Sequence, residues 1–262
     1  MKIGFFQYAP VFGDPKGNRQ RLVDAVLETD TDLLVAPELA TSGYFFPSSA
    51  EARHLAEPVP GPTTEALEKA AADSGCTIVT GLPERSGDVL YNSAVAVGPD
   101  GLIGTYRKIH LFNEEKLHFV PGNDGFFIFE LKGVRIGILT CFDHMFPEAA
   151  RSLALQGVQI ICHPSNLVLP EYGQLTSRVR ALENRMFWIL SNRWGDEQVD
   201  DRTLTFTGAS QVVHPTGKIL IRGDSRSDDL SAVDIDPDDA LDKMVTPLND
   251  LMKDRRPKFY SC

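Results

Sequence analysis

The sequence predicts a layered α/β domain with mixed sheets. Helical and strand patterns alternate along the 262 residues, which is typical of α/β folds. Several strands instead follow one another directly, as they do in antiparallel hairpins. The stretch Gly133–Asn166 reads as strand, helix and strand, which is a β-α-β unit. The combination argues against a purely parallel sheet and favours mixed sheets in one domain of ordinary size.

The N-terminal half is predicted from apolar runs and from the residues that begin or end them. Thr63 or Thr64 caps a helix that runs to Ser74, and Gly75 ends it. The turn at residues 98–101 joins two strands as a hairpin. In chain order, the other predicted elements are strand Lys2–Gln7, helix Asn18–Thr29, strand Asp32–Ala36, an aromatic-rich loop at Thr41–Ser49, and strands Thr77–Leu82, Leu90–Val97, Leu102–Tyr106 and Phe126–Glu130.

Gly133–Asn166 is the most informative stretch. Apolar residues alternate over Val134–Leu139 and predict a strand, while Pro147 suits the first turn of a helix that Gly157 closes. Cys141 therefore follows a strand, where open α/β sheets place their sites. It also lies near the start of a helix, whose dipole favours a thiolate. The alternative is that Cys141 is one more small buried residue, as free cysteines usually are.

The C-terminal part continues the alternation and ends in a charged tail. We predict a single domain over residues 1–262, in which residues 238–262 form a tail that contacts a partner subunit. Leu251–Tyr260 is too polar for a core but has apolar side chains that need a covering surface; a frayed terminus is the alternative. The predicted elements are strand Val158–Cys162, helix Gln174–Arg185, and strands Phe187–Ser191, Gly208–Val213, Lys218–Arg222 and Leu230–Ile235.

Composition argues against several classes of partner. The formal net charge is −10 and there is no basic stripe, so nucleic acids and anionic membrane surfaces are poor partners. The N-terminus begins directly as a strand and lacks the features of a signal peptide. No stretch approaches the apolar length of a membrane span. We therefore predict a cytoplasmic protein that acts on a small molecule.

The cysteines and histidines do not show the spacing of a metal site. Cys76, Cys141, Cys162 and Cys262 lie far apart, which predicts free thiols in a reducing compartment. The histidines lack metal-ligand spacing as well, so we predict neither a metal nor another cofactor. His144 shares the turn of Cys141, and we interpret it as a supporting or surface residue rather than the partner in a cysteine–histidine dyad.

Three side chains that can do chemistry each follow a predicted strand: Glu38, Lys108 and Cys141. Taken singly, the first two are better explained as a surface acid and a surface lysine. Together, the three supply what hydrolysis of an amide carbonyl needs. The reaction requires a nucleophile, a group that accepts and returns the proton, and a positive partner for the oxyanion.

Four segments resemble the nitrilase or carbon–nitrogen hydrolase superfamily. They are APELATSGY, GTYRKIHLF, LTCFDHMFPEAAR and HPSN, and the likeness extends over the whole chain. The nearest subgroup is the compact thermophile-type amidases that carry the name nitrilase. Where the family usually has Cys-Tyr-Asp, this chain has Cys141-Phe142-Asp143. The resemblance implies a four-layer α-β-β-α sandwich. It also implies a homodimer or larger homo-oligomer, with the helices Phe146–Leu155 and Gln174–Arg185 at the dimer face.

The resemblance also implies a role for individual residues. Cys141 becomes the nucleophile, Glu38 the general base and Lys108 the electrostatic stabiliser. The family's second glutamate lies in a segment of the form Glu-Lys-x-x-Phe-x-Pro-Gly, which here begins at Glu115 rather than at the preceding glutamate. The oxyanion is expected to bind Lys108 and the backbone N–H of Phe142.

Two further residues are predicted to contact substrate. Tyr44 belongs to an aromatic loop with Phe45 and Phe46, which would wall the acyl side of the substrate, although ordinary core packing is the alternative. Asn166 ends the strand after the nucleophile's helix and is expected at the pocket rim. Residues Tyr91–Ser93 are expected to support the site from an adjacent strand.

Three functions agree with these residues. The first is an amidase that converts a small amide to its acid and ammonia through a thioester on Cys141. The second is a nitrilase or an N-carbamoyl hydrolase using the same site. A carbamoyl amino acid would need a cation, and Arg178 and Arg193 lie near plausible rims without being diagnostic. The third, a non-catalytic binding protein, is disfavoured because no catalytic position has been replaced.

Overall fold

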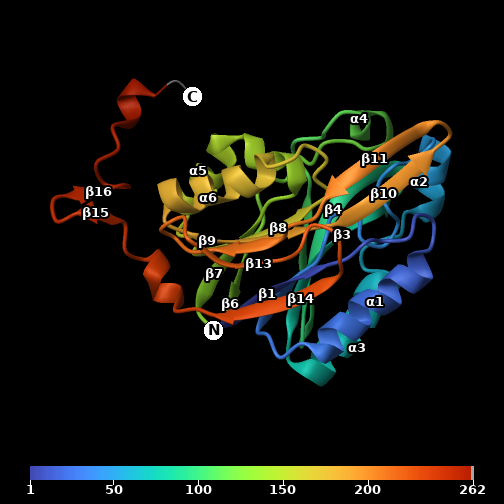
Figure 1. Ribbon diagram of the computed structural model, residues 1–262, viewed down its shortest axis with the longest axis horizontal. Helices are drawn as coiled ribbons and strands as arrows, with labels where there is room; N and C mark the ends of the chain where they lie inside the picture. The colour runs from blue at the N-terminus through green and yellow to red at the C-terminus, as the bar shows by residue number, and fades with distance from the viewer. Residues whose placement is uncertain (261–262) are drawn as a thin grey trace.

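Two six-stranded sheets face each other in the computed structural model, which describes residues 1–260 (Figure 1). In each sheet three parallel strands lie at the centre and antiparallel pairs flank them, so the prediction of mixed sheets is confirmed. The first sheet contains, in spatial order, β14 (Asp229–Asp234), β1 (Lys2–Gln7), β2 (Leu33–Val35), β3 (Thr77–Ser86), β4 (Val89–Gly98) and β5 (Gly101–Arg107). The second contains β13 (Ile219–Arg222), β12 (Gln211–Val213), β9 (Phe187–Asn192), β8 (Ile160–Ser165), β7 (Val134–Ile138) and β6 (Ile128–Leu131).

Helices cover the outer face of each sheet and complete the predicted four-layer α-β-β-α sandwich. On the first sheet lie α1 (Pro15–Glu28) and α3 (Pro62–Ser74), whose buried residues form one apolar cluster with that sheet. On the second lie α5 (Pro147–Leu155) and α6 (Tyr172–Asn184), which form another. Each helix therefore buries only one apolar stripe, as expected of a helix on a sheet.

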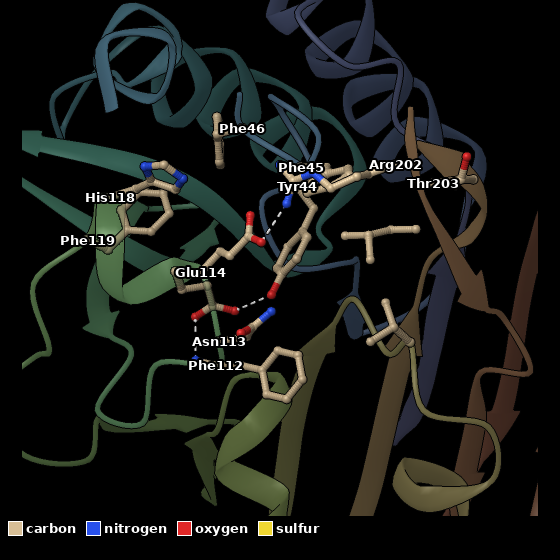
Figure 2. A pocket seen from close by; sticks show the side chains of 13 residues that line it. Tyr44, Phe45, Phe46, Phe112, Asn113, Glu114, His118, Phe119, Arg202 and Thr203 are labelled. Carbon is tan, nitrogen blue, oxygen red and sulfur yellow. Dashed lines mark hydrogen bonds and ion pairs between the residues drawn. The ribbon is translucent and has the colours of Figure 1, made fainter. Parts of the chain in front are cut away.

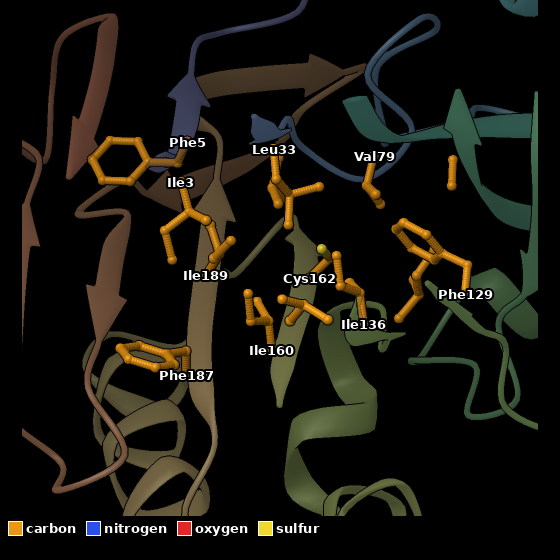
Figure 3. Close-up of a cluster of buried hydrophobic side chains, with 14 of the residues drawn as sticks. Ile3, Phe5, Leu33, Val79, Phe129, Ile136, Ile160, Cys162, Phe187 and Ile189 are labelled. Atoms are coloured by element: carbon orange, nitrogen blue, oxygen red, sulfur yellow. The ribbon is translucent and has the colours of Figure 1, made fainter. Parts of the chain in front are cut away.

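A third apolar cluster fills the space between the two sheets. Its members come from strands in which β-branched and aromatic residues alternate, so that every second side chain points inward. Figure 3 shows part of this cluster, with Ile3, Leu33 and Val79 from the first sheet and Ile136, Ile160 and Ile189 from the second. All six side chains are fully buried.

Two helix starts differ from prediction because of capping. The carboxylate of Asp14 accepts a hydrogen bond from Gly17 N at 2.9 Å, so α1 begins before Asn18. The expected threonine cap of α3 is wrong. Gly61 is the N-cap, and the Thr64 hydroxyl, inside the first turn, accepts from the Gly61 backbone N–H at 2.9 Å. The end of this helix is confirmed, since Gly75 adopts a left-handed φ of 78°.

Several short elements were not predicted. They are α2 (Ser49–Leu55), α4 (Glu115–His118), the hairpin of β10 (Trp194–Val199) and β11 (Arg202–Thr207), and, in the tail, the small hairpin of β15 (Met244–Thr246) and β16 (Asn249–Asp250). Figure 1 shows the tail extending away from the body of the molecule after β14, and its contacts with Gln159 and Arg185 lie just ahead of β8 and β9. Within residues 1–260 there is no helix with the length and apolar character needed to cross a bilayer.

Candidate active site

Three of the predicted site residues form one buried cluster. The Lys108 ammonium donates to Glu38 Oε1 at 2.6 Å and to Glu115 Oε1 at 2.8 Å. The side chains of Glu38 and Lys108 are fully buried, so the ion pairs are shielded from water. Cys141 is buried as well, and the charges of all three groups act on the pKa of its thiol. The surface interpretation of Glu38 and Lys108 is therefore wrong.

The local backbone dictates where the acid and the lysine lie. Glu38 comes three residues after β2, where a β-carbon on Gly81 would lie 2.5 Å from the Glu38 α-carbon. Only glycine at that position lets β3 approach so closely. Lys108 directly follows β5, and its N–H donates to the Asn92 carbonyl of β4 at 2.8 Å. Both side chains are thus held by the first sheet.

Neighbouring polar groups fix the two carboxylates. The Asn92 amide donates to Glu38 Oε1 at 2.8 Å and lies 3.5 Å from Glu115 Oε2, as expected for a supporting residue on the adjacent strand. The Tyr44 hydroxyl donates to Glu115 Oε1 at 2.8 Å, and Phe112 N donates to Glu115 Oε2 at 3.2 Å. Glu115, rather than its neighbour in sequence, thus faces the lysine.

The nucleophile turn has an unusual backbone. Cys141 has a φ of 43°, in the left-handed region, and starts a 3-10 turn, Cys141–Met145, ahead of α5. The carbonyl of Cys141 lies 2.9 Å from His163 Nε2, while Trp188 Nε1 donates to His163 Nδ1 at 3.1 Å. An indole can only donate, so the imidazole proton is on Nε2 and is donated to Cys141. Burial lowers the pKa of His163 to about 3 and keeps it neutral.

Asp143, the last residue of the Cys-Phe-Asp segment, joins the nucleophile turn to the end of β5. Its carboxylate accepts from Thr140 N and from the Tyr106 hydroxyl, each at 2.8 Å, and contacts His110 Nδ1 at 2.6 Å. Because Tyr106 and His110 flank Lys108, this fully buried acid sets the position of the lysine relative to the cysteine.

The expected thiolate is wrong for the resting site. Burial raises the pKa of the Cys141 thiol well above its ordinary value, and the charge of Glu38 raises it further, while Lys108 lowers it. The helix dipole does not compensate, because α5 begins only at Pro147 and the effect is confined to the first turn. The thiol therefore holds its proton until a base removes it. Burial likewise raises the pKa of Glu38, against the lowering effect of Lys108.

Two cavities adjoin the cluster. A small one of about 40 Å³ contacts Cys141, Phe142 and Asn166. A larger one of about 340 Å³ contacts Tyr44 and Glu115 and is shown in Figure 2. Both are bounded by the same two residues, Phe112 and Val168. The apolar lining of the larger cavity includes Tyr44, Phe45, Phe46, Phe112, Phe119, Val168 and Leu204.

The remaining candidate residues make their contacts away from the Lys108 ammonium. His144 is buried, its Nδ1 lies 2.7 Å from the Thr176 hydroxyl, and burial lowers its pKa to about 4. Its interpretation as a supporting residue agrees with this position; the surface alternative does not. Arg193 does not lie at a rim, because it is buried in an ion pair with Glu197. Arg178 Nε donates to the Gly217 carbonyl. Within residues 1–260, no group of three or more potential ligands is arranged for a metal ion.

Comparison with known proteins shows the family to which this fold and this buried cluster belong. Residues 2–241 match the carbon–nitrogen hydrolase family, and the chain belongs to that family. A nitrilase of Pyrococcus abyssi is 40% identical and an (R)-stereoselective amidase of a Pseudomonas species 36% identical. The alignments cover 99% of both chains in the first case, and 98% of this chain and 92% of the other in the second.

Solved structures of a nitrilase-superfamily amidase from Nesterenkonia sp. AN1 have the same fold. A glutamate-to-glutamine mutant of it, with acrylamide added at the active-site cysteine, is 26% identical and has a TM-score of 0.81, covering 98% of this chain and 97% of its own. The predictions of the family, of the fold and of an amidase-type carbon–nitrogen hydrolase are therefore confirmed.

Proposed function

We propose that this protein hydrolyses small amides to carboxylic acids and ammonia through a thioester on Cys141. The observation that carries the proposal is the arrangement of Glu38. Its Oε1 accepts from Lys108 and Asn92, whereas its buried Oε2 has no hydrogen-bond partner among residues 1–260. A fixed carboxylate with one unengaged oxygen, next to a protonated thiol, is suited to act as the general base.

In the proposed first half-reaction, Glu38 takes the thiol proton as the sulfur of Cys141 bonds to the amide carbon. The carbonyl electron pair moves to oxygen, where Lys108 and the backbone N–H of Phe142 hold it. Phe142 lies in the first turn of its 3-10 segment, where N–H groups lack partners inside the helix. When the carbon–nitrogen bond breaks, Glu38 returns the proton to nitrogen and ammonia leaves. Water, deprotonated by Glu38, then attacks the thioester carbon. The carbon–sulfur bond breaks, the acid leaves, and Glu38 returns the proton to the sulfur of Cys141.

Glu115 is proposed to keep Lys108 charged and directed at the oxyanion. Burial alone would lower the pKa of the lysine, but the charges of Glu115 and Glu38 outweigh it and raise that pKa above its ordinary value. Two carboxylates around one ammonium leave the cluster with excess negative charge. An ammonium that stays charged throughout the cycle can stabilise each oxyanion without exchanging protons.

Asn166 is proposed to select amides over nitriles. Its Nδ2 donates to the Glu38 backbone carbonyl at 2.9 Å, and because a carbonyl only accepts, the orientation of the amide group is fixed. This leaves Oδ1, which is buried and has no hydrogen-bond partner in the described part of the chain. Together with Glu38 Oε2, it makes the site rich in acceptors. A primary amide supplies two N–H donors, whereas a nitrile supplies none.

Asn166→Ala is expected to weaken amide binding selectively. In a Cys141→Ala background, the Kd of butyramide, measured by calorimetry, should rise about tenfold, the typical effect of losing one buried hydrogen bond. The Kd of butyronitrile, which has no donor for Oδ1, should change less than twofold and serves as the internal control. An equal loss for both ligands would contradict the assignment.

An ammonia-release panel with the purified enzyme tests the function as a whole. It should contain aliphatic and aromatic amides, the matching nitriles and N-carbamoyl compounds, all at matched size. The apolar lining of the larger cavity supports amides with apolar acyl groups as the best substrates. Faster turnover of nitriles or carbamoyl compounds would replace the amidase proposal by one of those two alternatives.

We further propose a homodimer or larger homo-oligomer in which α5 and α6 form the contact face, in the cytoplasm. Exposed apolar side chains support the interface, since Leu155, Leu175 and Leu182 are each about half exposed on these helices. The thiols of Cys76, Cys141 and Cys162 are free, which supports a reducing location, whereas Cys262 lies outside the described residues.

Deletion of the residues after Asn249 is expected to weaken the oligomer. In the deleted segment, Phe259 is 66% exposed, which is unfavourable unless a second subunit covers it. Sedimentation velocity over a dilution series should show dissociation at a concentration at least about tenfold higher than for the full chain, which corresponds to about 1.4 kcal/mol. Unchanged dissociation would contradict the role of the tail.

A further inference from the structure

A second buried ion pair lies behind the aromatic wall of the larger cavity. Arg193 lies just before β10 and Glu197 lies on it. They are 1% and 6% exposed and form a salt bridge. The Glu197 carboxylate also accepts hydrogen bonds from the backbone N–H groups of Tyr44, at 2.9 Å, and Phe45, at 2.7 Å. This acid therefore holds the loop that carries Tyr44.

The loop is shaped around that carboxylate. Gly43 has a φ of 84°, and a β-carbon on it would lie 2.7 Å from Glu197 Oε1. Only glycine therefore lets the backbone pass so close to the carboxylate that the N–H groups of the next two residues, Tyr44 and Phe45, can both donate to it.

The arginine supports the same tyrosine from the other side. Its guanidinium carbon lies 4.0 Å from the centre of the Phe206 ring, on β11. That ring in turn meets the Tyr44 ring edge-on, with 5.8 Å between centres. The ion pair thus contacts Tyr44 through its backbone and, by way of Phe206, through its ring. At its far end the Tyr44 hydroxyl donates to Glu115, which in turn accepts a hydrogen bond from Lys108.

We propose that Glu197, paired with Arg193, is a positioning residue for catalysis. It fixes Tyr44, which fixes Glu115 and so aims the Lys108 ammonium at the oxyanion. The β10–β11 hairpin thereby becomes part of the catalytic apparatus, although none of its residues needs to touch the reacting atoms. The inference rests on the proposed roles of Lys108 and Glu115.

A double-mutant cycle tests this chain of contacts. Its members are Glu197→Gln, Tyr44→Phe and the double variant. Tyr44→Phe keeps the ring but removes the hydrogen bond to Glu115, and should lower kcat/KM for the best amide about tenfold. Glu197→Gln should cost at least as much in the parent but less than about threefold in the Tyr44→Phe background, because the contact it supports is already gone.

Stability distinguishes positioning from a merely structural role. The shift in urea midpoint caused by Glu197→Gln should be similar in both backgrounds, whereas its effect on kcat/KM should not. Glu57→Gln is the matched control. Glu57 also accepts a backbone N–H, from Thr63 at 3.0 Å, and lies 3.8 Å from an arginine, but it does not line the cavity. The control should leave kcat/KM unchanged.

Removing one member of a buried ion pair is often strongly destabilising. If Glu197→Gln does not fold, Glu197→Asp replaces it, because aspartate keeps the charge but shortens the reach to the loop. The proposal would be overturned if Glu197→Gln or Glu197→Asp lowered kcat/KM by the same factor in both backgrounds. It would also be overturned if the variant kept the kcat/KM of the parent.

The same cycle should be run on the rate at which iodoacetamide alkylates Cys141, followed by mass spectrometry. Alkylation requires no turnover and forms no oxyanion, so its rate reports the charge that Lys108 places at the sulfur, which lowers the pKa of the Cys141 thiol. A coupled cycle in alkylation, together with no ammonia release by the parent from any amide, would reject the amidase proposal and keep the positioning role. An uncoupled cycle in an active parent would do the reverse.

Discussion

A Cys141→Ala variant is expected to fold like the parent and to release no ammonia from any amide. The proposed reaction forms a bond to sulfur, and neither Lys108 nor a backbone N–H can replace that nucleophile. The loss should exceed about 10⁴-fold in kcat, as for other enzymes that lose the attacking group. Intact-mass analysis should show an acyl adduct in the parent and none in the variant.

Cys162→Ala provides the matched control for Cys141→Ala. Cys162 is a second fully buried free thiol, on the neighbouring strand β8, and packs in the core between the sheets. Its truncation should lower the free energy of unfolding by about 1–2 kcal/mol while leaving kcat near the parental value. Ammonia release by Cys141→Ala at more than background would contradict the assignment of the nucleophile.

Glu38→Gln is expected to lose nearly all of kcat while substrate still binds. Glutamine keeps the shape and the hydrogen-bonding partners but cannot accept the thiol proton, and burial holds that proton firmly on Cys141. Single-turnover acylation, followed by mass spectrometry, separates the two half-reactions. Formation of the acyl-enzyme at the parental rate would show that Glu38 is not the base for attack, which would leave Glu115 as the candidate.

The pH profile and a second variant check the same assignment. Burial raises the pKa of Glu38 above its ordinary 4.5. Because the base must be ionised, kcat/KM of the parent should fall as the pH drops through that raised pKa, so the loss should begin above pH 4.5. Lys108→Met should be about as inactive as Glu38→Gln, and the double variant little worse than either, since groups that act as a unit are far from additive.

The positions of the three strand-end residues could be predicted because strand ends are visible in sequence. The apolar run at Leu33–Ala36 stops just before Glu38, and the alternation at Val134–Leu139 stops just before Cys141. Sheet topology then brings such ends together. Glu115 is different. It lies in a helix of only four residues, and the loop that carries it gives no pattern, so it was found only through the family resemblance.

Burial and long-range pairing could not be predicted. The thiolate expectation failed because a helix start is visible in the sequence, whereas two carboxylates next to the sulfur are not. The β10–β11 hairpin was missed because Trp194–Val199 lacks alternating apolar residues. Its buried position is occupied by Glu197, which is stable there only through Arg193 and the loop N–H groups. Strand propensity alone therefore predicts a loop where the structure has a strand with a buried acid.

The groups that we propose to react are divided between the two sheets. Glu38 and Lys108 extend from the first, and Cys141 extends from the second, with Asp143 as a polar tie between them. Misplacement by about 1 Å can cost a hundredfold in rate, so turnover is a sensitive gauge of sheet registry. On heating, activity should therefore disappear before circular dichroism detects any loss of strand or helix. Selection for turnover would then also act on the apolar residues between the sheets, far from any substrate.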